Sequence, residues 1–119
     1  RGAIFSEHIF PAVPSPANLS VRNRIISGLS LATIVVESAT NGGAMRTAAF
    51  AVEQDRFVCA IDWGTREHQM AAGTRQLIKS GAVAAPVEGL ADFVKAFTKS
   101  DSTPEFQATY VQGEQMDLF

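Results

Sequence analysis

A glycine-rich turn is the part of the sequence best suited to chemistry. It spans residues 37–43 (ESATNGG) and follows the apolar run Ile34-Val35-Val36. Glycines such as Gly42 and Gly43 let the backbone approach a phosphate, and the first turn of a helix offers unpaired N–H groups at the positive end of its dipole. Two glycines can equally serve only to make a tight turn, so both interpretations stay open. The GK[ST] ending of a P-loop is absent.

Four basic residues are candidates to join that turn. Arg22 and Arg24 fall on the polar side of an amphipathic pattern, and Arg75 and Lys79 stand four positions apart in a short helical pattern. Guanidinium groups bind phosphate oxygens in pairs, whereas exposed basic residues are more often simply solvated. We expect a local basic patch if the four side chains converge.

Signals for catalysis are weak. His8 and His68 are far apart in the chain and lack the spacing of metal ligands. Glu7 and Glu37 both end predicted strands and could approach each other as an acid–base pair, but structural pairing with a nearby arginine is the stronger expectation. We therefore predict a protein that is not an enzyme, with no catalytic residue, no cofactor and no metal.

Composition limits the class of protein. The chain has 119 residues, 46% of them hydrophobic and 18% charged, which suits one small domain with a packed core. Its net charge of −2 gives no general support to nucleic-acid binding, so any such site must be a local patch. The lone Cys59, interpreted as a buried filler, fits a cytoplasmic protein. No apolar stretch approaches the roughly 20 residues that a membrane span needs.

Apolar runs alternate with helical patterns along the chain. This order predicts an α/β, Rossmann-like, three-layer fold with a mostly parallel sheet flanked by helices. We expect strands at residues 3–6, 31–37, 56–61 and 82–85, and helices from Asn18 or Ser20 to about Leu29, over 44–54, over 73–80, and from Pro86 onward. Three prolines predict an extended connector over 8–17. Residues 100–119 are expected to form a polar tail.

Taken in order, these stretches resemble the DNA-processing protein A (DprA/Smf) family. Residues 22–26 (RNRII) match the family's FPxRNRIIxGLS segment without a break. A match over residues 2–7 precedes this segment, and further matches follow it in order over residues 34–37, 41–48 (the family's SGSLxTA), 51–56 (A-x-E-x-x-R) and 73–82. Two departures stand out: Gly42-Gly43 replaces Ser-Gly-Ser, and Asp62-Trp63-Gly64 stands where the family has Pro-Gly.

The resemblance implies a partial domain. It assigns residues 1–99 to the C-terminal half of a Rossmann-like domain, because the family's first strands and its Gly-Ser-Arg turn have no counterpart here. With a chain that begins at Arg1, we expect a fragment or a processed chain, completed by a missing N-terminal half or by a homodimer.

The same resemblance implies a function. Members bind single-stranded DNA, load a RecA-type recombinase onto it and act in natural transformation. Arg22, Arg24, Lys79 and the Gly42-Gly43 turn would then contact phosphates. The related Lonely-guy-like nucleotide phosphoribohydrolases offer an alternative, a nucleotide-binding enzyme with its PGGxGT turn at residues 41–43, but the Gly-Thr that should follow is absent.

The last five residues carry a separate signal. Residues 115–119 (QMDLF) resemble the pentapeptide by which bacterial proteins grip the sliding clamp. In that interpretation Gln115 bonds the rim of an apolar pocket, and Met116, Leu118 and Phe119 supply its apolar contacts. Docking on the chain's own domain, or on a twofold mate, is the alternative.

Overall fold

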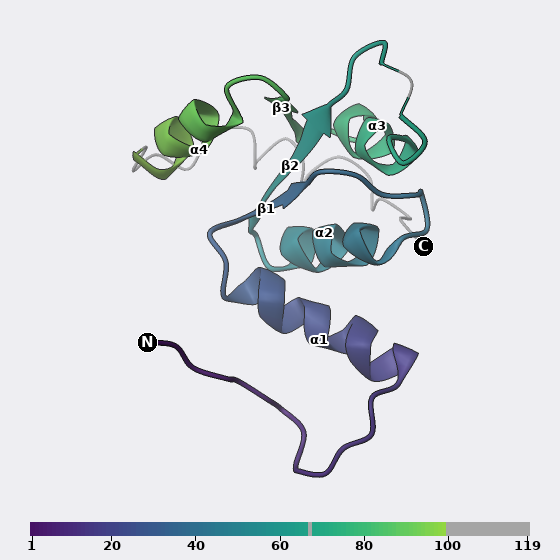
Figure 1. Ribbon diagram of the computed structural model, residues 1–119, viewed down its shortest axis with the longest axis vertical. Helices are drawn as coiled ribbons and strands as arrows, with labels where there is room; N and C mark the ends of the chain where they lie inside the picture. Colours follow the sequence, from purple (N-terminus) through teal and green to yellow (C-terminus); the bar gives the residue numbers. More distant parts are fainter. Residues whose placement is uncertain (67, 100–119) are drawn as a thin grey trace.

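Three parallel strands form the centre of the molecule. The computed structural model describes residues 1–66 and 68–99, and within them the strands are β1 (Ala32–Val35), β2 (Phe57–Asp62) and β3 (Val83–Pro86). Their order is β1-β2-β3, with Ala32 opposite Phe57 and Cys59 opposite Val83. These are the three later strands of the prediction, and the α/β Rossmann-like arrangement is confirmed (Figure 1).

Helices cover both faces of this sheet. They are α1 (Pro16–Gly28), α2 (Gly43–Glu53), α3 (Ala72–Lys79) and α4 (Leu90–Lys99). Packing of α2 and α3 on one face forms a core of Val35, Met45, Ala48, Ala51, Val58, Ala60, Leu77 and Ala82. On the other face, α4 packs against Cys59, Ile61 and Ala85. None of the described helices is long and apolar enough to cross a membrane.

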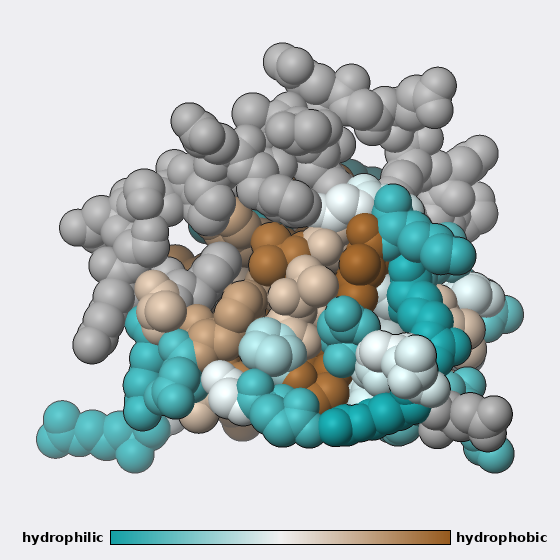
Figure 2. Space-filling view, turned by 90° about the horizontal axis from the view of Figure 1, so that it is seen from above, coloured by the Kyte–Doolittle hydropathy of each residue, from teal (hydrophilic) through white to brown (hydrophobic). Residues whose placement is uncertain are grey.

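Burial on both faces explains the unbroken apolar character of β2. Side chains alternate between the faces of a strand, so Val58 and Ala60 enter one core while Cys59 and Ile61 enter the other. Helix α1 adds an outer layer by packing on α2. Viewed from above, apolar residues gather in the middle of the surface, and hydrophilic residues border them (Figure 2).

Proline positions correct two predicted boundaries. Helix α1 begins at Pro16, inside the predicted connector, and Ser15 caps it by accepting from the Asn18 N–H at 3.1 Å. Proline suits the first position of a helix because its missing N–H would have no partner there. At the other end of the chain, Pro86 ends β3, and α4 starts only at Leu90.

The predicted strand at residues 3–6 is wrong. Residues 1–15 include no strand, and the side chain of Ile4 is 99% exposed. A strand is held by hydrogen bonds to a neighbouring strand. In the described sheet, the neighbour of β1 is β2, and no strand pairs with its other edge. The apolar pattern of this segment therefore has no sheet to join within the described residues.

A close backbone contact locks α3 against the loop that follows β1. The Ser38 N–H donates to the Met70 carbonyl at 2.7 Å, and the Gly73 N–H donates to the Ser38 carbonyl at 2.8 Å. A Cβ atom on Gly73 would lie 2.6 Å from the Ser38 carbonyl oxygen. Only glycine permits this approach without a backbone shift.

We expect Gly73→Ala to lower the free energy of unfolding by about 1–3 kcal/mol, because the added methyl group forces the Ser38 loop away. The matched control is Gly43→Ala, where a Cβ atom meets nothing within 4 Å and alanine favours the helix. Urea unfolding followed by circular dichroism measures both. Equal unfolding midpoints for the two variants would contradict the close-contact account.

Candidate functional site

Helices α1 and α2 run side by side in the same direction. Near their C-terminal ends, Gln54 accepts from the Ser27 hydroxyl at 2.7 Å and donates to the Arg24 carbonyl at 2.7 Å. Nearer their N-terminal ends, the Arg46 guanidinium donates to the Ser20 hydroxyl at 2.9 Å. Both first turns therefore lie at the carboxyl end of the sheet (Figure 1), where ligands of open α/β sheets bind.

A pocket of about 340 Å³ lies between these two helix beginnings. Hydrogen-bond donors dominate its polar lining, and its lining residues are Pro16, Leu19, Ser20, Arg22, Asn23, Asn41, Gly43 and Arg46. Two guanidinium groups, two side-chain amides and one hydroxyl can all donate hydrogen bonds to phosphate oxygens. We name this the α1–α2 pocket.

The glycine turn opens backbone toward the α1–α2 pocket. Gly42 is the N-cap of α2, and no side chain caps the helix there. A Cβ atom on Gly42 would overlap the Ser38 hydroxyl, whereas one on Gly43 would meet no atom within 4 Å. Gly42 is thus needed for the tight turn, and Gly43 leaves bare backbone at the positive end of a helix dipole. Gly42 therefore supports the tight-turn interpretation, and Gly43 supports the phosphate-binding interpretation.

The structure brings together only part of the predicted basic patch. Arg22 and Gly43 line the same pocket. Arg24 forms an ion pair with Glu7, which is the structural pairing expected for that carboxylate. In the first turn of α3, the Arg75 guanidinium donates to the Arg66 carbonyl at 3.1 Å.

Lys79 is not in the α1–α2 pocket. It lies in the last turn of α3, and the opposite end of that helix, at Gly73, contacts the Ser38 loop. Lys79 is six residues beyond Gly73, which corresponds to about 9 Å along the helix axis. The positions i and i+4 did place Arg75 and Lys79 on one helix, but spacing alone did not show which end of the helix faces the pocket.

Arg46 is the binding candidate that sequence reasoning missed. It belongs to the first turns of α2, three residues after Gly43, so its side chain reaches the same end of the helix. Helical spacing from the glycine turn was the signal that could have found it. With Arg22, it supplies positive charge to one site on a chain whose net charge is −2.

A second cluster occupies the carboxyl ends of β1 and β2. The Trp63 and His68 rings stack with centroids 4.2 Å apart and planes 18° apart. His68 Nε2 lies 3.2 Å from Glu37 Oε2, and the Trp63 indole N–H donates to the Val36 carbonyl at 2.9 Å. Glu37 is thus paired with a histidine and not with an arginine. Sequence patterns carried no signal for this stack, because it forms across a loop.

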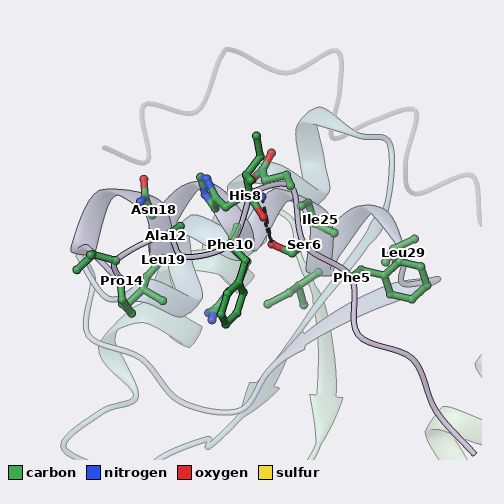
Figure 3. A pocket seen from close by; sticks show the side chains of 15 residues that line it. Phe5, Ser6, His8, Phe10, Ala12, Pro14, Asn18, Leu19, Ile25 and Leu29 are labelled. Atoms are coloured by element: carbon green, nitrogen blue, oxygen red, sulfur yellow. Dashed lines mark hydrogen bonds between the residues drawn. The ribbon is translucent and has the colours of Figure 1, made fainter.

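Below α1, a second hollow of about 440 Å³ separates the helix from the N-terminal segment. We name it the apolar groove. Its lining is mostly apolar and comes from both sides, including Phe5, Phe10, Leu19, Ile25, Ile26 and Leu29 (Figure 3). Phe10 is 96% exposed and Leu29 70%, so these side chains are far from being buried.

Cys59 is buried, as predicted. Burial raises the pKa of its thiol to about 11. At neutral pH the sulfur therefore stays protonated and is a poor nucleophile. Nearer the second cluster, the hydrogen bond from Arg66 lowers the pKa of the exposed Glu88 carboxyl.

The predicted clamp-binding residues 115–119 lie outside the described residues, and that prediction stays as it was.

Comparison with known proteins identifies the family. The family model described as DNA recombination-mediator protein A matches residues 1–98. Over 82 residues, or 69% of the chain, it is 43% identical to Protein Smf of Escherichia coli, covering 22% of that protein's length. It is 40% identical over 82 residues (69% of the chain, 20% of the relative) to Protein Smf of Synechocystis, and 41% identical over 81 residues (68% and 27%) to the DNA processing protein DprA of Bacillus subtilis.

The chain thus spans about a fifth to a quarter of the length of the curated relatives it matches. The resemblance drawn from the RNRII segment and the ordered blocks after it is confirmed over the whole described sheet. The chain belongs to the DNA recombination-mediator protein A (DprA/Smf) family of DNA-processing proteins.

Proposed function

We propose that this chain binds single-stranded DNA through its phosphates and acts as a recombination mediator that delivers the strand to a RecA-type recombinase. The observation that carries the proposal is the α1–α2 pocket, where Arg22, Arg46 and the uncapped start of α2 surround one space. Family membership supports the coarser statement that the chain takes part in DNA processing.

The donor set of the pocket suits phosphate on physical grounds. Two guanidinium groups can each donate two parallel hydrogen bonds to phosphate oxygens, and the helix dipole adds to their attraction. Asn23 and Asn41 add neutral donors at the rim. These groups recognise a backbone and carry no base code, so we expect strong salt dependence with little sequence preference.

The apolar groove supports a proposal about assembly. Exposed apolar side chains gathered around one hollow favour an interaction site. We propose that a second copy of the chain covers it, through residues of α1 that face the groove such as Ile26 and Leu29. The alternative occupant is a polypeptide that supplies the part of the relatives' length with no counterpart here.

For DNA binding, we expect Arg22→Ala and Arg46→Ala each to weaken binding of an oligo(dT) strand about tenfold at low salt, since each removes a charge-assisted contact. Each should also reduce the slope of log K against log salt by about 0.7. Fluorescence anisotropy at several salt concentrations measures both. Lys95→Ala on α4, which also removes an exposed positive charge, is the control and should change neither value. Unchanged affinity in both arginine variants would refute the pocket as the DNA site.

For assembly, we expect the intact chain to sediment as a dimer at micromolar concentration and the double variant Ile26→Glu/Leu29→Glu as a folded monomer, because buried charges without partners are costly. Val21→Glu is the control, since Val21 is 45% exposed on α1 but does not line the groove. A monomeric intact chain would point instead to the separate polypeptide.

For the clamp, we expect deletion of residues 115–119 to abolish co-purification with the bacterial sliding clamp. The reason is that Leu118 and Phe119 would supply the apolar anchors of the peptide. Thr109→Ala, placed in the same tail, is the control. Affinity for oligo(dT) should be the same before and after the deletion. Clamp binding that survives the deletion would show that the pentapeptide match is fortuitous.

A further inference from the structure

The Trp63 ring packs on the core, whereas the His68 ring stacked on it belongs to neither core cluster. Both rings lie on the loop that joins β2 to α3. A loop that only needs to leave the strand is served by small or polar turn residues such as Gly, Pro, Asn, Asp and Ser. An aromatic pair at this position therefore calls for another explanation.

Hydrogen bonds hold both rings in fixed orientations. The Trp63 indole N–H donates to the Val36 carbonyl at 2.9 Å. His68 Nδ1 accepts from the Met70 N–H at 3.3 Å, so the ring proton belongs on Nε2, which faces Glu37 Oε2 at 3.2 Å. The two rings are thus positioned before any ligand arrives, which reduces the entropy cost of stacking a further ring.

The stack ends at the surface. Trp63 packs against the core cluster of Cys59, Ile61 and Ala85, and His68 covers it from outside. The His68 side chain is 29% exposed even though one ring face meets Trp63. A flat group that reached the ring face turned away from Trp63 would extend the stack at the usual spacing of aromatic rings.

Charged side chains on and around this loop already have partners. Arg66 forms an ion pair with the exposed Glu88, and Glu37 faces His68. Arg75 donates to the Arg66 carbonyl at 3.1 Å. A planar, uncharged ligand fits beside these pairs better than a second anion does.

Chain connectivity places the stack close to the α1–α2 pocket. Glu37, which holds His68, is four residues before Asn41, which lines the pocket. Four residues span at most about 14 Å. The 2.7 Å hydrogen bond from Ser38 to the Met70 carbonyl ties the two loops together.

We propose that His68, held on Trp63, is a stacking platform for a nucleobase of the strand whose phosphates occupy the α1–α2 pocket. This inference rests on the proposed function. Stacking tolerates every base because each presents a π face, and single-stranded DNA binders combine such platforms with basic grooves. The platform adds affinity for bases as a class, with no choice among them.

Two DNA strands of equal length distinguish base stacking on His68 from phosphate binding in the α1–α2 pocket. The intact 119-residue chain is titrated at low salt with oligo(dT) of about 12 nucleotides and with an abasic strand of the same length. Anisotropy of labelled strands gives the affinities. Trp63 is the chain's single tryptophan, so its fluorescence reports on the stack directly.

We expect oligo(dT) to bind at least about fivefold tighter than the abasic strand and to change the Trp63 emission, which the abasic strand leaves unchanged. His68→Ala should bring the affinity ratio close to one while keeping the affinity for the abasic strand. His68→Phe, which keeps a flat ring, should restore the ratio. Arg22→Ala should weaken both strands by the same factor and leave the ratio unchanged.

Each contrary result has a distinct meaning. Equal affinity of the intact chain for the two strands overturns the platform and leaves the phosphate site standing, and this result needs no variant to fold. A ratio that survives in His68→Ala also overturns the platform. Failure of the intact chain to bind either strand overturns the proposed function and the platform with it.

Discussion

The close contact between Ser38 and the start of α3 is the constraint on which the rest of the carboxyl edge depends. Through its N–H and carbonyl, Ser38 joins the loop after β1 to Met70 and Gly73. The same loop continues into the Gly42-Gly43 turn, and the residue before it, Glu37, holds His68. One backbone contact therefore determines where the pocket and the aromatic stack lie relative to each other. Small residues at 42 and 73 are the condition for it, because a side chain at either would strike Ser38.

Positively charged side chains gather at this edge because of the fold geometry and not because of the overall charge. The chain carries a net charge of −2, yet Arg22 and Arg46 meet beside the uncapped start of α2. Their convergence depends on α1 and α2 running in parallel, which the two hydrogen bonds of Gln54 secure at the far end. Under the proposed function, a polyanion would bind at this one place and be weakly repelled elsewhere, which favours a defined strand path over diffuse binding.

Local sequence was enough for most elements but not for the contacts between them. The β-branched run Ile34-Val35-Val36 and the apolar run 57–61 predicted the central strands, because burial on both faces leaves a continuous apolar signature. Residues 3–6 carry a similar signature, but a strand needs a neighbour, and neighbours are not local. Three features depend on how the elements pack in three dimensions. They are the position of the α3 end that bears Lys79, the approach of Arg46 to α1, and the stack of the Trp63 and His68 rings. For that reason sequence patterns singled out Arg22 and Gly43, which line the α1–α2 pocket, but not Arg46 beside them.

Arg22 links the α1–α2 pocket to the apolar groove. Its side chain lines both the α1–α2 pocket and the apolar groove. Whatever covers the groove therefore touches a residue proposed to bind phosphate, and it biases the orientation of that guanidinium. Thermodynamic linkage makes such an effect reciprocal: if assembly on the groove orders Arg22 for phosphate, then a bound strand must strengthen assembly by the same factor. In that arrangement a DNA strand and a protein partner act on one side chain from opposite sides of α1, with no larger conformational change required.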